Sequence, residues 1–225
     1  MDMRQQLLQQ QTKLHRILHT RGQWSNAQPL FLRQHAMLHS AAMEAGSAWS
    51  YEDAILKGLS EDQARLQPGE GMNSIAWLIW HIARIEDVTM NFLVAGRPQV
   101  LDEENWLEQL HLDRRDVGTS MNDAEIADIS AQIHIPALRA YRVAVGRRTR
   151  EICRNLQPAE AEERVDTTHI QALVSAGTLA EGAYDLAEYW SGKRKTALLG
   201  MPATRHSLTH LNQALLVRKK LGLGF

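Results

Sequence analysis

The sequence predicts an all-α protein built around a helical bundle. Apolar residues recur at spacings of three and four along most of the 225-residue chain, as they do on one face of an α-helix. The strict alternation of apolar and polar residues that marks a half-buried strand is hard to find. Glycine or proline stands where the periodic segments end, as at Gly22, Gly96 and Pro158. We therefore expect about five to seven helices joined by short loops and one longer connection.

The first part of the chain is expected to contain two helical segments. Residues 3–20 indicate a Gln-rich helix that ends at Gly22. A second segment covers residues 29–59 and has a weak point at Gly46, because glycine inside a helix costs about 1 kcal/mol relative to alanine. In the first segment the apolar residues at helical spacing are Leu7, Leu14 and Leu18.

The clearest helix spans residues 74–95, with Asn73 or Ser74 placed to cap its first turn. Apolar side chains cover so much of its circumference that we expect it to be buried. The apolar positions are Ile75, Trp77, Leu78, Ile79, Trp80, Ile82 and Ile85. Residues 99–121 are expected to form an irregular connection with one short helix.

The second part of the chain is expected to contain three further helical stretches. One begins at Asn122, and a long amphipathic helix follows over residues 136–156, because proline is favoured in the first turn of a helix. Residues 170–199 are helical in tendency but contain several glycines. Pro202 is expected to begin the last helix, which ends near Gly222.

Composition excludes several classes of function. The formal net charge of -1 and the pI of about 6.8 predict neither a nucleic acid nor an anionic membrane as partner. No run approaches the roughly 18–20 apolar residues of a membrane span, and the N-terminus lacks the apolar stretch of a signal peptide. We therefore expect a cytoplasmic protein. The single cysteine, Cys153, excludes an intrachain disulfide and is expected to be an inert core residue, and the basic residues of 147–154 are expected to form a solvated face.

Ten histidines are present, and six of them form pairs four residues apart: His15 and His19, His35 and His39, and His206 and His210. This spacing places both imidazoles on one face of a helix, where they can bind one metal ion. Since the pattern occurs three times in one chain, each pair alone is also explained by ordinary core or solvated histidines. The neighbouring residues must distinguish among the pairs.

His206 and His210 have the surroundings of an inward-facing site. His81 lies on the helix expected to be most buried, where a ring nitrogen needs a partner. Three inward-facing imidazoles from two helices favour a shared divalent metal ion over three separate core histidines. The residues that share the face of the pair are small or apolar: Ala203, Ala214 and Val217.

His35 and His39 are the second candidate, since they also lie among apolar residues. Either one is a possible fourth ligand, and a closed shell of four ligands would indicate a structural metal. His15 and His19 lie near the terminus on a mixed face and are expected to be solvated.

Two segments together resemble a known family. NSIAWLIWHIARIEDVTMNFLVAGRP (residues 73–98) is followed far downstream by MPATRHSLTHLNQALLVRKKLG (residues 201–222). This combination resembles the DinB/YfiT-like superfamily of helical metal-binding proteins over residues 29–222. Residues 1–25 are then an extra N-terminal helix, and residues 1–225 form a single domain.

The resemblance implies a four-helix core and a metal triad of His81, His206 and His210. In the ergothioneine-synthesis and thiol-transferase branches of this superfamily, a carboxylate often follows the second histidine of the terminal motif by two residues. This chain has Asn212 at that position. The resemblance therefore leaves the branch and the reaction open.

A three-imidazole site leaves a position for water or substrate, as catalytic metal sites require. Nitrogen ligands suit zinc, nickel, copper or iron, with zinc and nickel foremost. The expected function is that of a metal-dependent hydrolase or thiol transferase acting on a small molecule, with a low-molecular-weight thiol as one substrate. The alternative is a non-catalytic, stress-associated metal-binding or helical interaction protein. A homodimer formed through an apolar helix face is compatible with both.

No second catalytic group is evident in the sequence. Glu86 and Asp87 are turned away from the predicted metal face and are expected on a polar face or in ion pairs. Gln213 could reach the site from its edge. Trp77 and Trp80 are expected to pack in the core.

Overall fold

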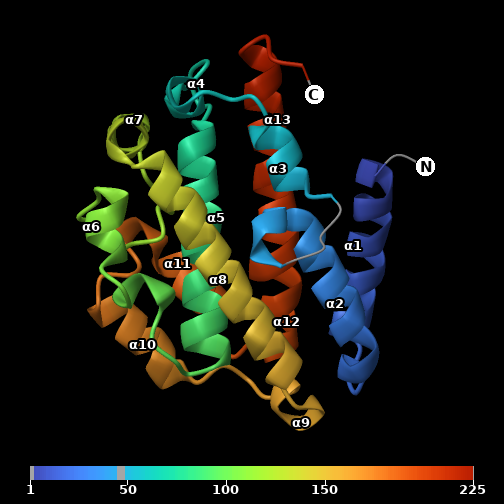
Figure 1. The fold of residues 1–225 in the computed structure, drawn as a ribbon. Coiled ribbons are helices and arrows are strands. Elements are labelled where there is room, and N and C mark those ends of the chain that lie inside the picture. Colours follow the sequence, from blue (N-terminus) through green and yellow to red (C-terminus); the bar gives the residue numbers. More distant parts are fainter. Residues whose placement is uncertain (1–2, 45–48, 225) are drawn as a thin grey trace.

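The computed structural model describes residues 3–44 and 49–224, and these form an all-α fold without a β-strand (Figure 1). The predicted fold class is confirmed. Helix α5 (Ile75–Asp87) lies at the centre and contacts both α8 (Ile135–Asn155) and α13 (Ser207–Lys220). Helix α2 (Trp24–Leu38) contacts the same two helices. None of the described helices is long and apolar enough to cross a membrane.

The Gln-rich N-terminal helix α1 (Met3–His19) lies at the outer edge of the molecule, beside α2 (Figure 1). It also contacts α12 (Lys195–Gly200) from the far end of the chain. Its buried side chains follow the predicted helical spacing and include Leu7, Leu14 and Leu18.

The expected second segment, 29–59, is divided more finely than predicted. Helix α2 begins at Trp24 and tolerates Pro29 inside it, and it ends because His39 is extended. Gly46, the predicted weak point, lies outside the described residues. Serine side chains cap the short helices that follow, since each accepts a bond from a backbone N–H of the first turn. These helices are η1 (Ala41–Met43), α3 (Tyr51–Leu56) and α4 (Glu61–Arg65).

Helix α5 begins as predicted, with the Ser74 hydroxyl accepting a 2.9 Å bond from the Trp77 amide. It continues as a π-helical segment, η2 (Val88–Val94). The helix predicted from Asn122 is also confirmed, because Asn122 and Glu125 form a capping box. The connection between them contains η3 (Val100–Asp102) and α6 (Trp106–Leu110), and the capped helix is α7 (Asp123–Gln132).

The last helix is continuous with the helix before it. Pro202 lies in the first turn of the π-helical segment η5 (Met201–His206), as predicted, but this segment joins α12 to α13 without a break. Proline has no N–H to donate to the preceding turn, so a wider turn at this point loses no further hydrogen bond. The remaining elements are α9 (Pro158–Ala161), α10 (Thr167–Ser175), η4 (Glu181–Ala183) and α11 (Tyr184–Trp190).

The long connection is attached to α5 through a buried ion pair. Arg84 donates to Asp87 at 3.2 Å and to the carbonyl of Arg115 at 2.7 Å. The Asp87 carboxylate also accepts the backbone N–H groups of Val100 and Leu101 at 2.8 and 2.9 Å. Because these bonds satisfy charges that lie in the core, they fix the path of the connection over α5.

The basic residues of 147–154 form a solvated face only in part: Arg147 and Arg154 are exposed, as predicted, whereas Arg148 is partly buried. Arg150 is buried and donates to the Leu32 carbonyl at 2.6 Å, and it shares the Glu44 carboxylate with Arg154. Arg148 donates to Glu103 at 2.8 Å. These arginines bind neighbouring segments to α8, since long basic side chains can span the distance between packed elements.

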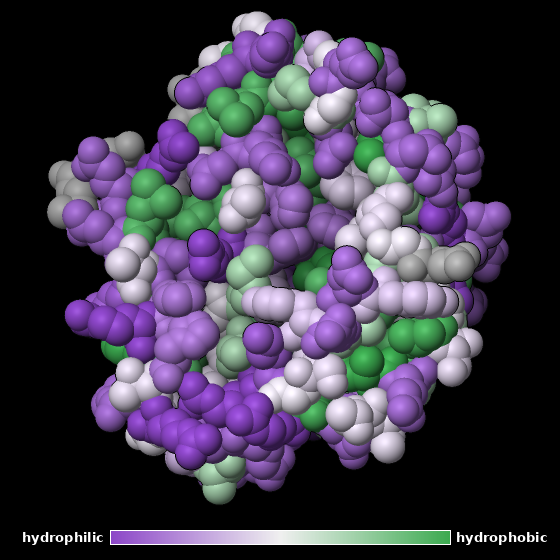
Figure 2. Space-filling view, turned by 180° about the vertical axis from the view of Figure 1, so that it is seen from behind, coloured by the Kyte–Doolittle hydropathy of each residue, from purple (hydrophilic) through white to green (hydrophobic). Residues whose placement is uncertain are grey.

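The face of the molecule seen in Figure 2 is mixed in character, with hydrophilic residues over most of it and apolar residues in separate groups. The large apolar side chains that are exposed lie on several different elements. Among the described residues they are Met3, Leu8, Leu66, Tyr184, Tyr189 and Leu216.

Gly146 permits the close approach of α8 to the end of α2. A Cβ atom at this position would lie 2.6 Å from His39 Nδ1 and 2.6 Å from Met43 Sδ. Alanine normally stabilises a helix relative to glycine by about 1 kcal/mol. Here we expect the opposite sign: Gly146→Ala lowers the free energy of unfolding by about 1–3 kcal/mol, because it overpacks the contact.

Urea unfolding measures this difference. Ala140→Gly is the control, because Ala140 is exposed on the same helix and glycine there should cost only the intrinsic helix propensity of about 1 kcal/mol. A Gly146→Ala protein more stable than the wild type would contradict the packing described here.

Candidate metal centre

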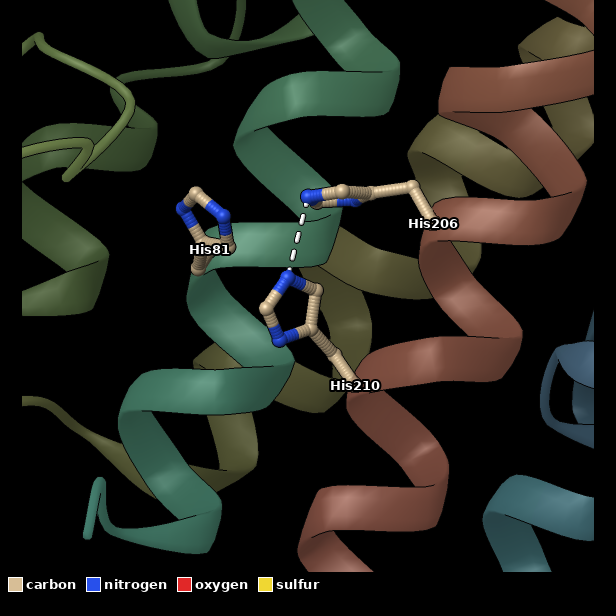
Figure 3. A group of neighbouring side chains, drawn as sticks. All are labelled: His81, His206 and His210. Carbon is tan, nitrogen blue, oxygen red and sulfur yellow. Dashed lines mark hydrogen bonds between the residues drawn. The ribbon is translucent and has the colours of Figure 1, made fainter.

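Two helices bring the three predicted histidines together. His81 projects from the middle of α5, while His206 ends η5 and His210 lies one turn further on, in α13 (Figure 3). One ring nitrogen from each lies within 4.8 Å of the others. The ring centroids are 4.3 Å apart for His206 and His210, and 4.9–5.0 Å from each of these to His81. Within the described part of the chain this group contains no carboxylate.

Hydrogen bonds orient two of the three rings. His81 Nδ1 lies 2.5 Å from the Val117 carbonyl oxygen, and His210 Nδ1 lies 2.7 Å from Gln213 Oε1. Both oxygens can only accept, so each Nδ1 carries the proton and each Nε2 keeps its lone pair. Metal-binding histidines usually make this arrangement, with the second ring nitrogen bonded to an oxygen. The expected contribution of Gln213 at the edge of the site is observed.

The third ring completes the group. His206 Nε2 lies 3.0 Å from His210 Nε2, and this contact is the dashed line in Figure 3. His206 Nδ1 is buried and has no hydrogen-bond partner among the described residues. With the lone pair of His210 directed at it, His206 Nε2 carries a proton in the absence of a cation, and this proton would move to His206 Nδ1 when Nε2 binds one.

Burial keeps the three imidazoles neutral. Burial, together with the neighbouring His210, lowers the pKa of His81 to about 3. Burial also lowers the pKa of His206 well below its ordinary value, with smaller contributions from His81 and His210, and it lowers the pKa of His210. Neutral imidazole is the form that binds metal ions. His81 is almost fully buried, whereas His206 and His210 are partly exposed, so the group is open to solvent on one side.

Aromatic packing holds His81 from its other face. The Trp77 ring stacks on it at 4.7 Å with an interplanar angle of 10°. Gly118, which follows the hydrogen-bonding carbonyl of Val117, has a φ of +79°, and a Cβ there would lie 2.5 Å from Trp80. Only glycine fits this position, so the loop can reach His81. Both tryptophans are buried as predicted, and Trp77 also positions a candidate ligand.

Asn212 does not take part in the group. Its side-chain oxygen accepts the Tyr51 hydroxyl at 2.8 Å and an Arg4 nitrogen at 3.2 Å. These bonds connect α13 to α3 and α1. Asn212, at the position where the resemblance implied a carboxylate in some branches, therefore has a structural role in this chain.

His35 and His39 form a second, separate cluster with Glu86 rather than joining His81. His35 Nε2 and His39 Nε2 lie 2.8 Å from the two oxygens of the Glu86 carboxylate, and Arg142 donates to the same carboxylate at 2.7 Å. All four side chains are fully buried. Of the two predicted alternatives for Glu86, the ion pair is therefore correct and the polar face is wrong.

The second cluster fits a hydrogen-bonded network better than a metal site. An ionised carboxylate only accepts, so both Nε2 atoms that face it carry protons. A metal would require those protons to move to the Nδ1 atoms, which are buried without a partner in the described structure. The donor set of two histidines and a glutamate is typical of zinc. Around His81, however, only the His206 ring would have to change tautomer to bind a metal, whereas both rings at Glu86 would have to do so.

The sequence predicted the grouping of His81, His206 and His210 and the position of Gln213 beside it, but it missed two features of the two clusters. It also predicted correctly that Cys153 is buried, and burial raises the pKa of its thiol to about 12. It missed the Val117 carbonyl, because a backbone acceptor in an irregular connection leaves no mark in the residue pattern. It also missed the link between His35, His39 and Glu86, although their spacing of four was visible. His15 and His19 are exposed or partly so, as expected.

Comparison with known proteins supports the fold. The sequence profile of the DinB superfamily matches residues 46–183. This range includes His81 and ends before α13. A crystal structure of a conserved protein from Enterococcus faecalis has the same fold, with a TM-score of 0.58 and 15% sequence identity, covering 84% of this chain and 96% of that one. No curated protein matches the chain.

The Glu86 cluster yields a matched pair of variants. Burial alone would raise the pKa of Glu86, but His39, His35 and Arg142 hold it well below its ordinary value. Burial raises the pKa of Glu52, whose carboxylate accepts one side-chain hydrogen bond within the described residues, from Arg142 at 3.1 Å. At pH 7 we expect Glu86→Gln to lower the free energy of unfolding by about 3–5 kcal/mol, and Glu52→Gln to lower it by clearly less.

Chemical unfolding from pH 7 to well below the unfolded pKa of glutamate, about 4.3, tests both signs. Glu86 contributes stability above its unfolded pKa of about 4.3 and loses it as the pH falls toward its depressed folded pKa, so the deficit of Glu86→Gln should shrink in acid. Because the folded-state pKa of Glu52 is raised, its ionisation lowers the stability of the wild type as the pH rises. The difference in unfolding free energy between the wild type and Glu52→Gln should therefore be most favourable to the variant at neutral pH. Equal losses for the two variants at pH 7 would refute the unequal roles assigned to these carboxylates.

Proposed function

The chain belongs to the DinB superfamily, and from this premise we propose that it is a metal-dependent enzyme acting on a small molecule through His81, His206 and His210. One observation carries the proposal. The three ring nitrogens lie within 4.8 Å of one another, and His81 and His210 have their other nitrogens bonded to oxygen acceptors. Such outer bonds orient ligating imidazoles and increase their basicity.

The donor set suits a divalent ion, zinc or nickel foremost, held by three neutral nitrogens. When bound, such an ion supplies positive charge that lowers the pKa of a water or a thiol at the position left open. Val117 and Gln213 keep the rings of His81 and His210 aimed at that point. The partly exposed imidazoles of α13 leave a side through which a substrate can approach.

Thiol transfer is the reaction we favour over hydrolysis. Activation of water, with a pKa of about 15.7, commonly uses a carboxylate base beside the metal. The described part of this group contains no such carboxylate. A low-molecular-weight thiol, with a pKa of about 8.5, needs less assistance to ionise. A cytoplasmic location, where such thiols are kept reduced, belongs to the same proposal.

A closed structural metal site is the weaker alternative. It would need a fourth protein ligand, and the sequence offered His35 or His39 for that role. Both rings are instead bonded to Glu86. The dimer expected from the apolar helix stays a prediction, since it is compatible with either kind of site.

Elemental analysis of protein incubated with zinc and dialysed tests the site. We expect about one zinc per chain in the wild type, and loss of zinc in His81→Ala and His210→Ala, because two imidazoles do not complete the set. His19→Ala is the matched control, since His19 belongs to a pair with the same spacing, with ring centroids 4.3 Å apart, on an exposed face. Zinc retained in full by His210→Ala would exclude the triad.

Cobalt substitution tests the substrate class. We expect 2-mercaptoethanol or cysteine, added to the cobalt-loaded protein, to produce a sulfur-to-cobalt charge-transfer band in the near ultraviolet. Ethylene glycol and serine are the matched oxygen controls and should give none. If the thiols give no band while the zinc-loaded protein hydrolyses aryl esters, the hydrolase is the correct assignment.

A further inference from the structure

The turn that carries His206 is unusual. Helices α12 and α13 are joined by the π-helical segment η5, and His206 is its last residue. A π turn holds one residue more than an α turn, and each residue advances an α-helix by about 100°. The extra residue therefore sets how His206 and His210 are rotated relative to the buried face of α12. If η5 relaxed to regular α-helix, the pair would turn away from α5.

Thr204 lies inside this turn and is fully buried. Its hydroxyl donates to the Gly200 carbonyl at 2.9 Å, with the Leu199 carbonyl at 3.3 Å. A threonine hydroxyl can bond a carbonyl of the preceding turn of its own helix. Thr204 therefore links η5 to the end of α12 through a side-chain hydrogen bond.

A side chain from the N-terminal helix α1 donates a hydrogen bond to the same Thr204 hydroxyl. Gln11 Nε2 donates to the Thr204 hydroxyl at 3.3 Å, and Gln34 Nε2 of α2 donates to Gln11 Oε1 at 3.0 Å and to the Leu7 carbonyl at 3.2 Å. Gln11 is 7% exposed, and Gln34 and Thr204 are fully buried. Apolar residues could pack α1 against its neighbours without desolvating amides. A buried chain of polar groups instead requires one particular register between the helices.

We propose that α1 is a positioning element for the metal centre, and that Gln11, supported by Gln34, holds the Thr204 turn that directs His206 at His81. The expected effect on metal binding rests on the proposed function. The link from α1 to the Thr204 turn rests on the hydrogen bonds alone. It gives the Gln-rich helix, which precedes the segment matched by the DinB profile, a role in the site. Gln11 and Thr204 act through His206 and do not touch a substrate.

The first test is zinc affinity in the full-length protein, measured by competition with a chromophoric chelator. Gln11→Leu and Thr204→Val should weaken zinc binding about tenfold, as for other groups that orient ligands, while Thr204→Ser, which keeps the hydroxyl, should bind like the wild type. Thr209→Val is the matched control: its hydroxyl donates to the Arg205 carbonyl at 3.0 Å on the exposed side of the same helix, and its loss should leave the affinity unchanged.

The second test needs no metal. Amide hydrogen exchange of residues 201–210 should accelerate in Gln11→Leu and in Thr204→Val but not in Thr209→Val, since only the first two release the turn. Zinc affinity and exchange both equal to the wild type in Gln11→Leu would overturn the inference, and that variant alone decides the question if Thr204→Val fails to fold. If the wild type binds no zinc, the proposed function fails, and exchange still decides whether α1 holds the turn.

Discussion

The complete burial of α5 is the constraint on which the rest of the structure depends. Every residue from Ile75 to Asp87 is buried, and four of them are polar or charged. A buried charge or imidazole without a partner destabilises the fold by several kcal/mol or more, so each must be matched by another element. Arg84 and Asp87 bind the long connection, Glu86 binds α2 and α8, and His81 binds the Val117 carbonyl and faces α13. The polar residues of one helix thus determine where its neighbours lie.

Two histidine clusters result from this arrangement, and they differ in one respect that matters chemically. Around Glu86 the Nε2 atoms carry protons because they face a carboxylate, so the rings serve as donors in a closed network. In His81 and His210 the protons lie on Nδ1, bonded to Val117 and Gln213, so two of the three Nε2 atoms present lone pairs to a common point. The same HxxxH spacing therefore produces an ion-pair anchor in α2 and a candidate ligand set in α13. The groups that surround the rings, and not the spacing of the histidines, determine whether a pair forms ion pairs or is a candidate ligand set.

Regular features were predictable from the sequence, whereas irregular ones were not. The caps at Ser74 and Asn122 and the extent of the buried helix follow from local hydrogen-bonding and hydrophobic periodicity, which act within a few residues. The division of 29–59 into α2 and three short helices was not predicted, and neither was the continuity of α12, η5 and α13. At both places a side chain bonds to a distant segment: His39 to Glu86, and Thr204 to Gln11.

The sequence by itself determined that the chain is all-α, that one helix is central and buried, and that His81, His206 and His210 face inward, because these properties follow from which residues are apolar and how they are spaced. Only the tertiary structure decided which histidine pair meets a third imidazole and which meets a carboxylate. It alone also decided that Asn212 is engaged by Tyr51 and Arg4, and that the N-terminal helix reaches the turn before His206. These outcomes depend on side chains up to 208 residues apart in the sequence. Their meeting is set by how whole helices pack, and no local pattern encodes that.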